Sequence, residues 1–183
     1  MKADNILVEK TGICKISDFG ISKRTDDLNG IASTAMQGTV FWMAPEVIDP
    51  QKKGYNSKID IWSVGCVVLE MWAGKRPWSD DEAITVMFKV CFFVYAAARV
   101  TLMSLLQVYQ NKQPPPIPSD VILSDLARDF KDRCFAMQVL SLTVLLMCSW
   151  MMISDPEERA SVTELQRHPY LELPEGWVFN DFK

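Results

Sequence analysis

The sequence lacks the segments that would direct this protein into or across a membrane. Its first four residues, Met-Lys-Ala-Asp, contain no apolar signal region. The mainly apolar run at residues 139–153 is shorter than the ~20 residues that a membrane-spanning helix needs. The five cysteines are odd in number and have no C-x-x-C spacing, so they do not form a recognisable disulfide framework. We therefore expect a reducing, cytoplasmic location.

The sequence also lacks a concentration of charge of one sign. Its 19 basic and 23 acidic residues are interspersed and give a formal net charge of -4, so no basic surface for nucleic acid or anionic lipid is expected. With 183 residues, 49% of them hydrophobic, the chain is long enough to bury one core. We predict one globular unit that binds neither nucleic acid nor membrane.

The first half of the chain contains patterns for a hairpin, a loop and a buried helix. Apolar and β-branched residues on both sides of Gly12 predict a β-hairpin within residues 5–17. Residues 21–40 are polar and have no apolar period, which predicts a long surface loop. Residues 58–73 are apolar on nearly all sides and end at Gly74, which predicts a buried central helix.

The second half predicts an extended segment and two helices. Prolines at 114–118 cannot continue a helix and should run extended across the surface. An amphipathic pattern predicts a helix over about 124–137. The last helix should start near Ser161, because Glu164 has capping-box spacing to it, and should end before Pro169.

The tripeptide at 18–20, Asp-Phe-Gly, follows an expected strand and precedes the polar loop. A carboxylate at this place can hold a hard cation that bridges phosphate oxygens. Alone, such a tripeptide is weak support for a function. However, residues 2–5 (Lys-Ala-Asp-Asn) precede it and residues 44–46 (Ala-Pro-Glu) follow it at the distances of a kinase activation segment.

These motifs, in this order, resemble the protein kinases. Lys2 and Asn5 resemble the end of the catalytic loop H-R-D-L-K-x-x-N, and the lysine is the pattern of the Ser/Thr kinases. The similarity is strongest to MAP kinase kinase kinases, of the fungal cell-integrity type. It implies a mainly α-helical kinase C-terminal lobe with a small β-hairpin, without the N-terminal lobe. The partial kinase domain would cover 1–171 and a tail 172–183.

The resemblance implies roles for individual residues. Asn5 and Asp18 would bind Mg²⁺ and, through it, ATP, while Lys2 would lie beside the γ-phosphate. The run 36–46 looks like the substrate-facing loop, in which Thr39 would bridge the catalytic loop and the acceptor residue. Ser33 and Thr34 are candidate phosphorylation sites that could order the polar loop, because phosphate adds charge that arginine can pair with. These side chains form the expected functional and regulatory set.

Three further residues are expected to be structural. The resemblance implies that Asp60 accepts hydrogen bonds from the catalytic-loop backbone, although an aspartate at a helix start can also complement the helix dipole. Arg159 would form a buried ion pair with Glu46. His168, the one histidine, resembles part of the signature that closes the last kinase helix.

Two stretches, at about 90–107 and 138–154, do not fit the family. In kinases a cysteine such as Cys134 lies four residues before the aspartate of D-P-x-x-R, whereas Asp155 follows it by 21 positions, so about 17 residues are extra. The stretches are either translated introns or real insertions. Real insertions should form extra helices that expose apolar surface.

The resemblance implies transfer of the ATP γ-phosphoryl group to Ser/Thr hydroxyls of a protein, with a MAP kinase kinase as the expected substrate. The catalytic aspartate would precede Met1, so we expect this chain alone to be inactive. One alternative is a non-catalytic lobe that binds a substrate kinase through the substrate-facing loop and the region of Trp78. Another is a membrane-anchored regulator that uses residues 139–153.

Overall fold

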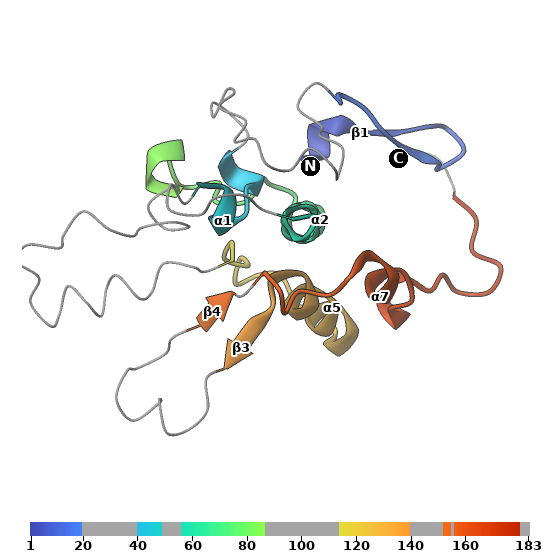
Figure 1. The fold of residues 1–183 in the computed structure, drawn as a ribbon. Coiled ribbons are helices and arrows are strands. Elements are labelled where there is room, and N and C mark those ends of the chain that lie inside the picture. The colour runs from blue at the N-terminus through green and yellow to red at the C-terminus, as the bar shows by residue number, and fades with distance from the viewer. Residues whose placement is uncertain (20–39, 49–55, 87–113, 140–151, 155, 180–183) are drawn as a thin grey trace, which may run out of the picture.

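The computed structural model describes residues 1–19, 40–48, 56–86, 114–139, 152–154 and 156–179. These parts of the chain are mostly helical and contain two antiparallel strand pairs (Figure 1). In chain order the elements are η1 (Ala3–Asn5), β1 (Ile6–Val8), β2 (Cys14–Ile16), η3 (Val40–Trp42), α1 (Pro45–Ile48), α2 (Lys58–Ala73), α5 (Asp125–Phe135), β3 (Met137–Val139), β4 (Met152–Ser154), α7 (Val162–Gln166) and η4 (Pro169–Leu171).

The central helix α2 confirms the prediction for residues 58–73. It ends at Gly74, which adopts a left-handed conformation with φ of 65° and donates its N–H to Glu70 O. Glycine reaches this conformation without the steric cost that a Cβ atom would add. Ile61, Trp62, Cys66, Val67 and Leu69 of α2 are all buried. Figure 1 views this helix almost along its axis, between the β1–β2 hairpin and α5.

The helix α5 confirms the amphipathic prediction and packs closely on α2. It begins after Ser124, whose hydroxyl accepts a hydrogen bond from the N–H of Ala127, and buries Phe130 and Phe135 among its core residues. Close approach of the two helices requires Gly65, because a Cβ atom there would lie 2.8 Å from Phe135 Cζ and equally close to the Cβ of the neighbouring cysteine. The Trp62 and Phe135 rings meet edge to face at 4.8 Å.

The short helix α7 confirms the predicted capping box. Ser161 Oγ accepts the N–H of Glu164, and the Glu164 carboxylate accepts the N–H of Ser161. Just after α7, the buried His168 joins this end of the chain to α5, because its Nε2 lies 2.9 Å from Asp129 Oδ2. The other ring nitrogen, Nδ1, accepts the N–H of Tyr170. His168 therefore carries its hydrogen on Nε2 and donates it to Asp129.

The N-terminal hairpin is also confirmed. Strands β1 and β2 are antiparallel, with Ile6 opposite Ile16 and Val8 opposite Cys14. Ile6 packs against the main core, whereas Leu7 and Ile16 are exposed. The hairpin thus contacts the main core through Ile6, at the end where β1 begins.

The stretch at 138–154 differs from expectation where the structure describes it. The residues at its two ends, β3 and β4, pair as antiparallel strands instead of continuing a helix, so the prediction of extra helices is wrong for these residues. The physical reason is the end of α5 at Ala136, which adopts a left-handed conformation with φ of 48° and turns the chain out of the helix. Backbone groups beyond it pair with the returning strand.

Several other expectations lie outside the described residues. These are the insertion at 90–107, the centre of the stretch at 138–154 and the loop 21–40, except Val40, which begins η3. Most of the apolar run 139–153 lies outside as well. Among the helices that the structure describes, none is long and apolar enough to cross a membrane. The prolines at 114–118 form neither helix nor strand, as expected.

Candidate functional site

The hairpin brings Asn5 and Asp18 to the same end of two paired strands. Asn5 ends η1 directly before β1, and Ser17 follows β2 directly. The N–H and the hydroxyl of Ser17 both donate to the carbonyl oxygen of Asn5, at 2.8 and 3.2 Å. Asp18 is the next residue, so the two predicted metal ligands are neighbours although 13 positions separate them. Lys2, at the start of η1, has its Nζ 3.7 Å from Asp4 Oδ2.

The backbone of Asp18 has an uncommon conformation. Its φ of 59° lies in the left-handed region, which few residues other than glycine adopt. Such conformations carry a steric cost and cluster at ligand-binding sites. The side chain is exposed and therefore accessible to a ligand. This combination supports a binding role for the carboxylate.

The donor set suits Mg²⁺ bound together with phosphate. The Asn5 amide and the Asp18 carboxylate offer hard oxygen atoms, which Mg²⁺ prefers, and this ion is usually held by one or two carboxylates plus substrate phosphates. Among the described residues, no group of three or more His, Cys, Asp or Glu side chains could hold a metal ion. An Mg²⁺ ion at this pair would need further oxygen ligands, which phosphate groups can supply.

A second part of the site is the segment from η3 to α1, which α2 holds in place. The indole N–H of Trp42 donates to Glu70 Oε2 at 3.0 Å, and Ser63 Oγ donates to the backbone oxygen of Trp42 at 2.9 Å. Burial raises the pKa of Glu70, and the hydrogen bond from Trp42 partly opposes this change. One side chain and one backbone group of Trp42 are thus anchored on the same helix, at positions about two turns apart.

The neighbouring residue Phe41 is covered by a cation. The guanidinium carbon of Arg76 lies 3.8 Å from the centre of the Phe41 ring, in a cation–π contact. Trp78, close by, is buried although its φ is 57°, which is a genuine outlier for a bulky residue. Arg76 and Trp78 also line a pocket of about 160 Å³ with the proline segment 115–118. Backbone strain thus lies next to the predicted substrate-facing segment.

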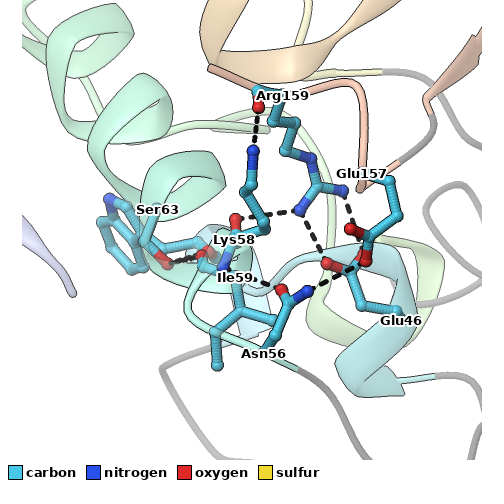
Figure 2. A network of polar contacts seen from close by, with 8 residues as sticks. Glu46, Asn56, Lys58, Ile59, Ser63, Glu157 and Arg159 are labelled. Carbon is cyan, nitrogen blue, oxygen red and sulfur yellow. Dashed lines mark hydrogen bonds and ion pairs between the residues drawn. The ribbon is translucent and has the colours of Figure 1, made fainter. Parts of the chain in front are cut away.

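The third part is a buried ion pair between Glu46 in α1 and Arg159 (Figure 2). The Nη1 and Nη2 atoms of Arg159 lie 2.6 and 2.9 Å from the two carboxylate oxygens of Glu46. Both side chains are buried: the exposed fraction is 0% for the arginine side chain and 5% for the glutamate side chain. Two parallel hydrogen bonds between charged groups make this a strong and geometrically specific contact.

A wider polar network, which was not predicted from the sequence, surrounds this pair. Arg159 Nη1 donates to Lys58 O at 3.0 Å, and Lys58 Nζ donates to Arg159 O (Figure 2). The Asn56 side chain accepts the N–H of Lys58 and donates to Glu157 Oε1 at 2.9 Å. An asparagine just before a helix is the signal that could have indicated part of this network. The network ties the start of α2 to the segment before α7.

Asp60 lies in the first turn of α2 and is exposed. Burial lowers the pKa of the Met1 amino group, and the negative charge of Asp60 acts in the opposite direction. The hydrogen bonds from the catalytic-loop backbone that the resemblance implies for Asp60 stay a prediction.

The remaining predicted residues lie outside the described part of the chain. They are Thr39 and the two candidate phosphorylation sites, Ser33 and Thr34. The structure thus brings Asn5 next to Asp18 and Glu46 next to Arg159. The functional roles of all these residues stay predictions. The Trp42–Glu70 and Phe41–Arg76 contacts, which the sequence analysis did not predict, are part of the same region.

Comparison with known proteins gives matches over nearly the whole chain. The family model described as protein kinase domain matches residues 1–171. The serine/threonine-protein kinase BCK1/SLK1/SSP31 of Saccharomyces cerevisiae is 42% identical over 98% of this chain, and the MAP kinase kinase kinase mkh1 of Schizosaccharomyces pombe is 40% identical over 99%. The mitogen-activated protein kinase kinase kinase 3 of Arabidopsis thaliana is 36% identical over 93%.

These matches also delimit what the chain represents. The chain spans 10% of the Saccharomyces cerevisiae protein, 13% of the Schizosaccharomyces pombe protein and 21% of the Arabidopsis thaliana protein. The two fungal matches leave only about four residues of the chain or fewer uncovered. They therefore include most of residues 172–179, which lie beyond the family model.

Proposed function

Because this chain belongs to the protein kinase family, we propose that it forms the C-terminal lobe of a Ser/Thr kinase that transfers the γ-phosphoryl group of ATP to a protein. The domain would extend over 1–171, with atypical insertions at about 90–107 and 138–154. The observation that carries the proposal is the placement of Asn5 and Asp18 at one end of the hairpin, tied together through Ser17.

In this proposal the hairpin residues bind the nucleotide. Asn5 and Asp18 hold Mg²⁺, and Lys2 lies beside the γ-phosphate. The bound ion supplies positive charge that stabilises the phosphates during transfer. The left-handed backbone of Asp18 keeps its carboxylate at the end of the hairpin, where it is exposed to the ligand.

The segment from Thr39 to Glu46 would face the protein substrate. Thr39 would bridge the catalytic loop and the acceptor hydroxyl group, while the contacts of Trp42 with α2 hold the following residues. The Glu46–Arg159 pair stabilises the end of this segment. Phosphorylation of Ser33 or Thr34 would order the preceding residues, because it adds negative charge that basic side chains can pair with.

The proposed substrate is a MAP kinase kinase in the cytoplasm. The support is the set of relatives whose names identify them as MAP kinase kinase kinases, in fungi and in a plant. Identity is higher to the fungal proteins than to the plant protein, which supports a fungal cell-integrity type. ATP and Mg²⁺ would be the cofactors.

The test measures phosphate transfer by the full-length protein to a purified, kinase-inactive MAP kinase kinase with Mg²⁺ and ATP. Asp18→Asn should lower the rate at least about 100-fold, since charge stabilisation by a metal ion is worth several kcal/mol. The matched control is Asp120→Asn, at an exposed position away from the hairpin. Equal rates for the two variants would disprove the role of Asp18. Binding of the MAP kinase kinase without any transfer by the unmodified protein would favour a non-catalytic binding module.

A further inference from the structure

The chain that follows the kinase match packs on the turn of the β1–β2 hairpin. Gly12, in this turn, has φ of 81°, and a Cβ atom there would lie 2.6 Å from Phe179 Cγ and 2.8 Å from Phe179 Cβ. No real side chain tolerates such distances, so the Phe179 ring lies directly against the glycine backbone. Figure 1 shows the red segment after α7 running away from this helix and ending next to the hairpin.

Residues 172–179 reach the hairpin without a helix or strand of their own. A turn at Gly176, with φ of 76°, includes a hydrogen bond from the N–H of Trp177 to Pro174 O at 3.0 Å. The Trp177 and Phe179 ring centres are 6.5 Å apart. Trp177 and Val178 are exposed, whereas Phe179 is half-buried. Phe179 is therefore the apolar residue that anchors the end of this segment.

Hydrogen bonds connect the turn of the hairpin with its other end. At the turn, Gly12 donates its N–H to Glu9 O at 2.8 Å, and Glu9 donates its N–H to Ile13 O at 2.9 Å. The paired strands continue to the other end, where Ser17 is bonded to Asn5. A two-stranded hairpin is only marginally stable by itself. A contact at the turn can therefore decide how firmly the Asn5 end is held.

We propose that residues 172–179 form a strap, with Phe179 as a positioning residue that restrains the hairpin through Gly12. The strap limits opening of the β1–β2 turn and so fixes the end of the hairpin that carries Asn5 and Asp18. The expected consequence for nucleotide binding rests on the function proposed above. The mechanical part of the inference, restraint of the hairpin by the tail, does not depend on it.

The first test is hydrogen–deuterium exchange of peptides covering residues 6–17 in the full-length protein. Phe179→Ala should accelerate exchange at the turn about fivefold, because loss of an aromatic contact lowers the cost of local opening. Val178→Ala is the matched control, since Val178 is exposed in the same segment, and it should leave exchange unchanged. Unchanged exchange in both Phe179→Ala and Phe179→Leu would overturn the strap.

The second test separates the Phe179 contact from backbone strain. Gly12→Ala adds both a collision with Phe179 and strain at a positive φ, whereas Gly74→Ala adds strain where no atom lies within 4 Å. Adding Phe179→Ala to Gly12→Ala should therefore recover part of the hairpin protection, because the collision with the Phe179 ring is removed and only that with its Cβ atom is left. The strap is wrong if the two substitutions act additively.

Enzyme kinetics distinguish failure of the strap from failure of the proposed function. Phe179→Ala should raise KM for ATP at given Mg²⁺ about fivefold with a smaller effect on kcat, as expected for a change in ligand positioning. Faster hairpin exchange in a protein that transfers no phosphate would support the strap and disprove the kinase proposal. If the protein is an active kinase but Phe179→Ala changes neither hydrogen exchange of the hairpin nor KM for ATP, the strap alone is disproved.

Discussion

Glu46 and Arg159 lie 113 positions apart in the sequence and form a two-point ion pair in the protein interior. The pair links α1, which ends the substrate-facing segment, to the residues just before α7. Arg159 also lies over the Trp62 ring, 5.0 Å from its centre, and donates to Lys58 O. One guanidinium group thus joins α1, the start of α2 and the main core.

Removal of one partner of this pair should be strongly destabilising. Arg159→Leu leaves the Glu46 carboxylate buried without its counter-charge, which typically costs about 3–5 kcal/mol. We expect a decrease of this size in the free energy of unfolding, measured by urea denaturation. The matched control is Arg133→Leu, because Arg133 pairs with Asp129 at the surface, where ion pairs contribute about 0–1 kcal/mol. Equal losses for both variants would contradict this account.

The Asp129–His168 contact predicts a pH dependence of stability. Hydrogen bonds from His168 and then Arg133 lower the pKa of Asp129. A carboxylate with a lowered pKa in the folded state stabilises that state above its unfolded pKa of about 3.9. This contribution is lost as the pH falls through the lower folded value. Asp129→Asn should therefore reduce stability at pH 5, and the difference from the unmodified protein should disappear in stronger acid.

Unfolding free energies of both proteins between pH 5 and strong acid measure this effect. Asparagine keeps an oxygen atom that can accept the Nε2–H of His168, so the comparison reports the charge of Asp129 and not its shape. Glu158→Gln is the control, because it removes one carboxylate charge at an exposed position. The prediction would be contradicted if the difference in unfolding free energy between Asp129→Asn and the unmodified protein persists or grows in acid.

The sequence predicted those elements whose signals are local. The end of α2 follows from Gly74, and the start of α7 follows from the spacing of Ser161 and Glu164. The pair Glu46–Arg159 was implied by resemblance, because no local pattern connects residues so far apart. Strands 137–139 and 152–154 were missed, since each has only three residues and their pairing is a long-range property.

The contacts that complete the candidate site are also long-range. Trp42 and Glu70 are 28 positions apart, and the sequence contains no period that would bring these two residues together. Phe179 meets Gly12 from the opposite end of the chain, in a tail that has no regular pattern. Such contacts depend on the packing of α2 with its neighbours. The local sequence therefore does not indicate that these residues touch.

Gly65 gives a further prediction for the core. A methyl group at this position would lie 2.8 Å from Cys134 Cβ and from Phe135 Cζ. Because Cβ atoms cannot rotate away, α5 must move, and overpacking of this kind typically costs about 1–3 kcal/mol. Gly65→Ala should lower the midpoint of urea denaturation although alanine favours a helix. Ala73→Ser, at a half-buried position on the same helix, should change it little. A stabilising effect of Gly65→Ala would show that the helices are farther apart.

The paired ends of the stretch at 138–154 predict that it can be removed. Met137 is directly opposite Ser154, and opposite Cα atoms in such strands are about 4.5–5.5 Å apart, close to the 3.8 Å between consecutive residues. After deletion of 138–154, residue 137 would take the place of Ser154 before residue 155, which requires a shift of about this distance. The hydrogen bond from the N–H of Ala160 to Arg133 O, at 3.0 Å, holds the two flanking segments together independently.

A variant without residues 138–154 should therefore keep its fold and the Glu46–Arg159 pair. Its midpoint of urea denaturation should equal or exceed that of the complete chain. Its soluble yield should rise, because the deletion removes the apolar run 139–153, and exposed apolar surface favours aggregation. Replacement of 140–151 by a Gly/Ser linker of equal length is the control for loss of the apolar side chains alone. If the deletion unfolds the protein while the linker variant stays folded, the strands β3 and β4 are required for stability. If both variants unfold, the apolar residues belong to the core and the stretch is a real insertion. Mature transcripts should then encode the stretch at high abundance, whereas a retained intron would be absent from most of them.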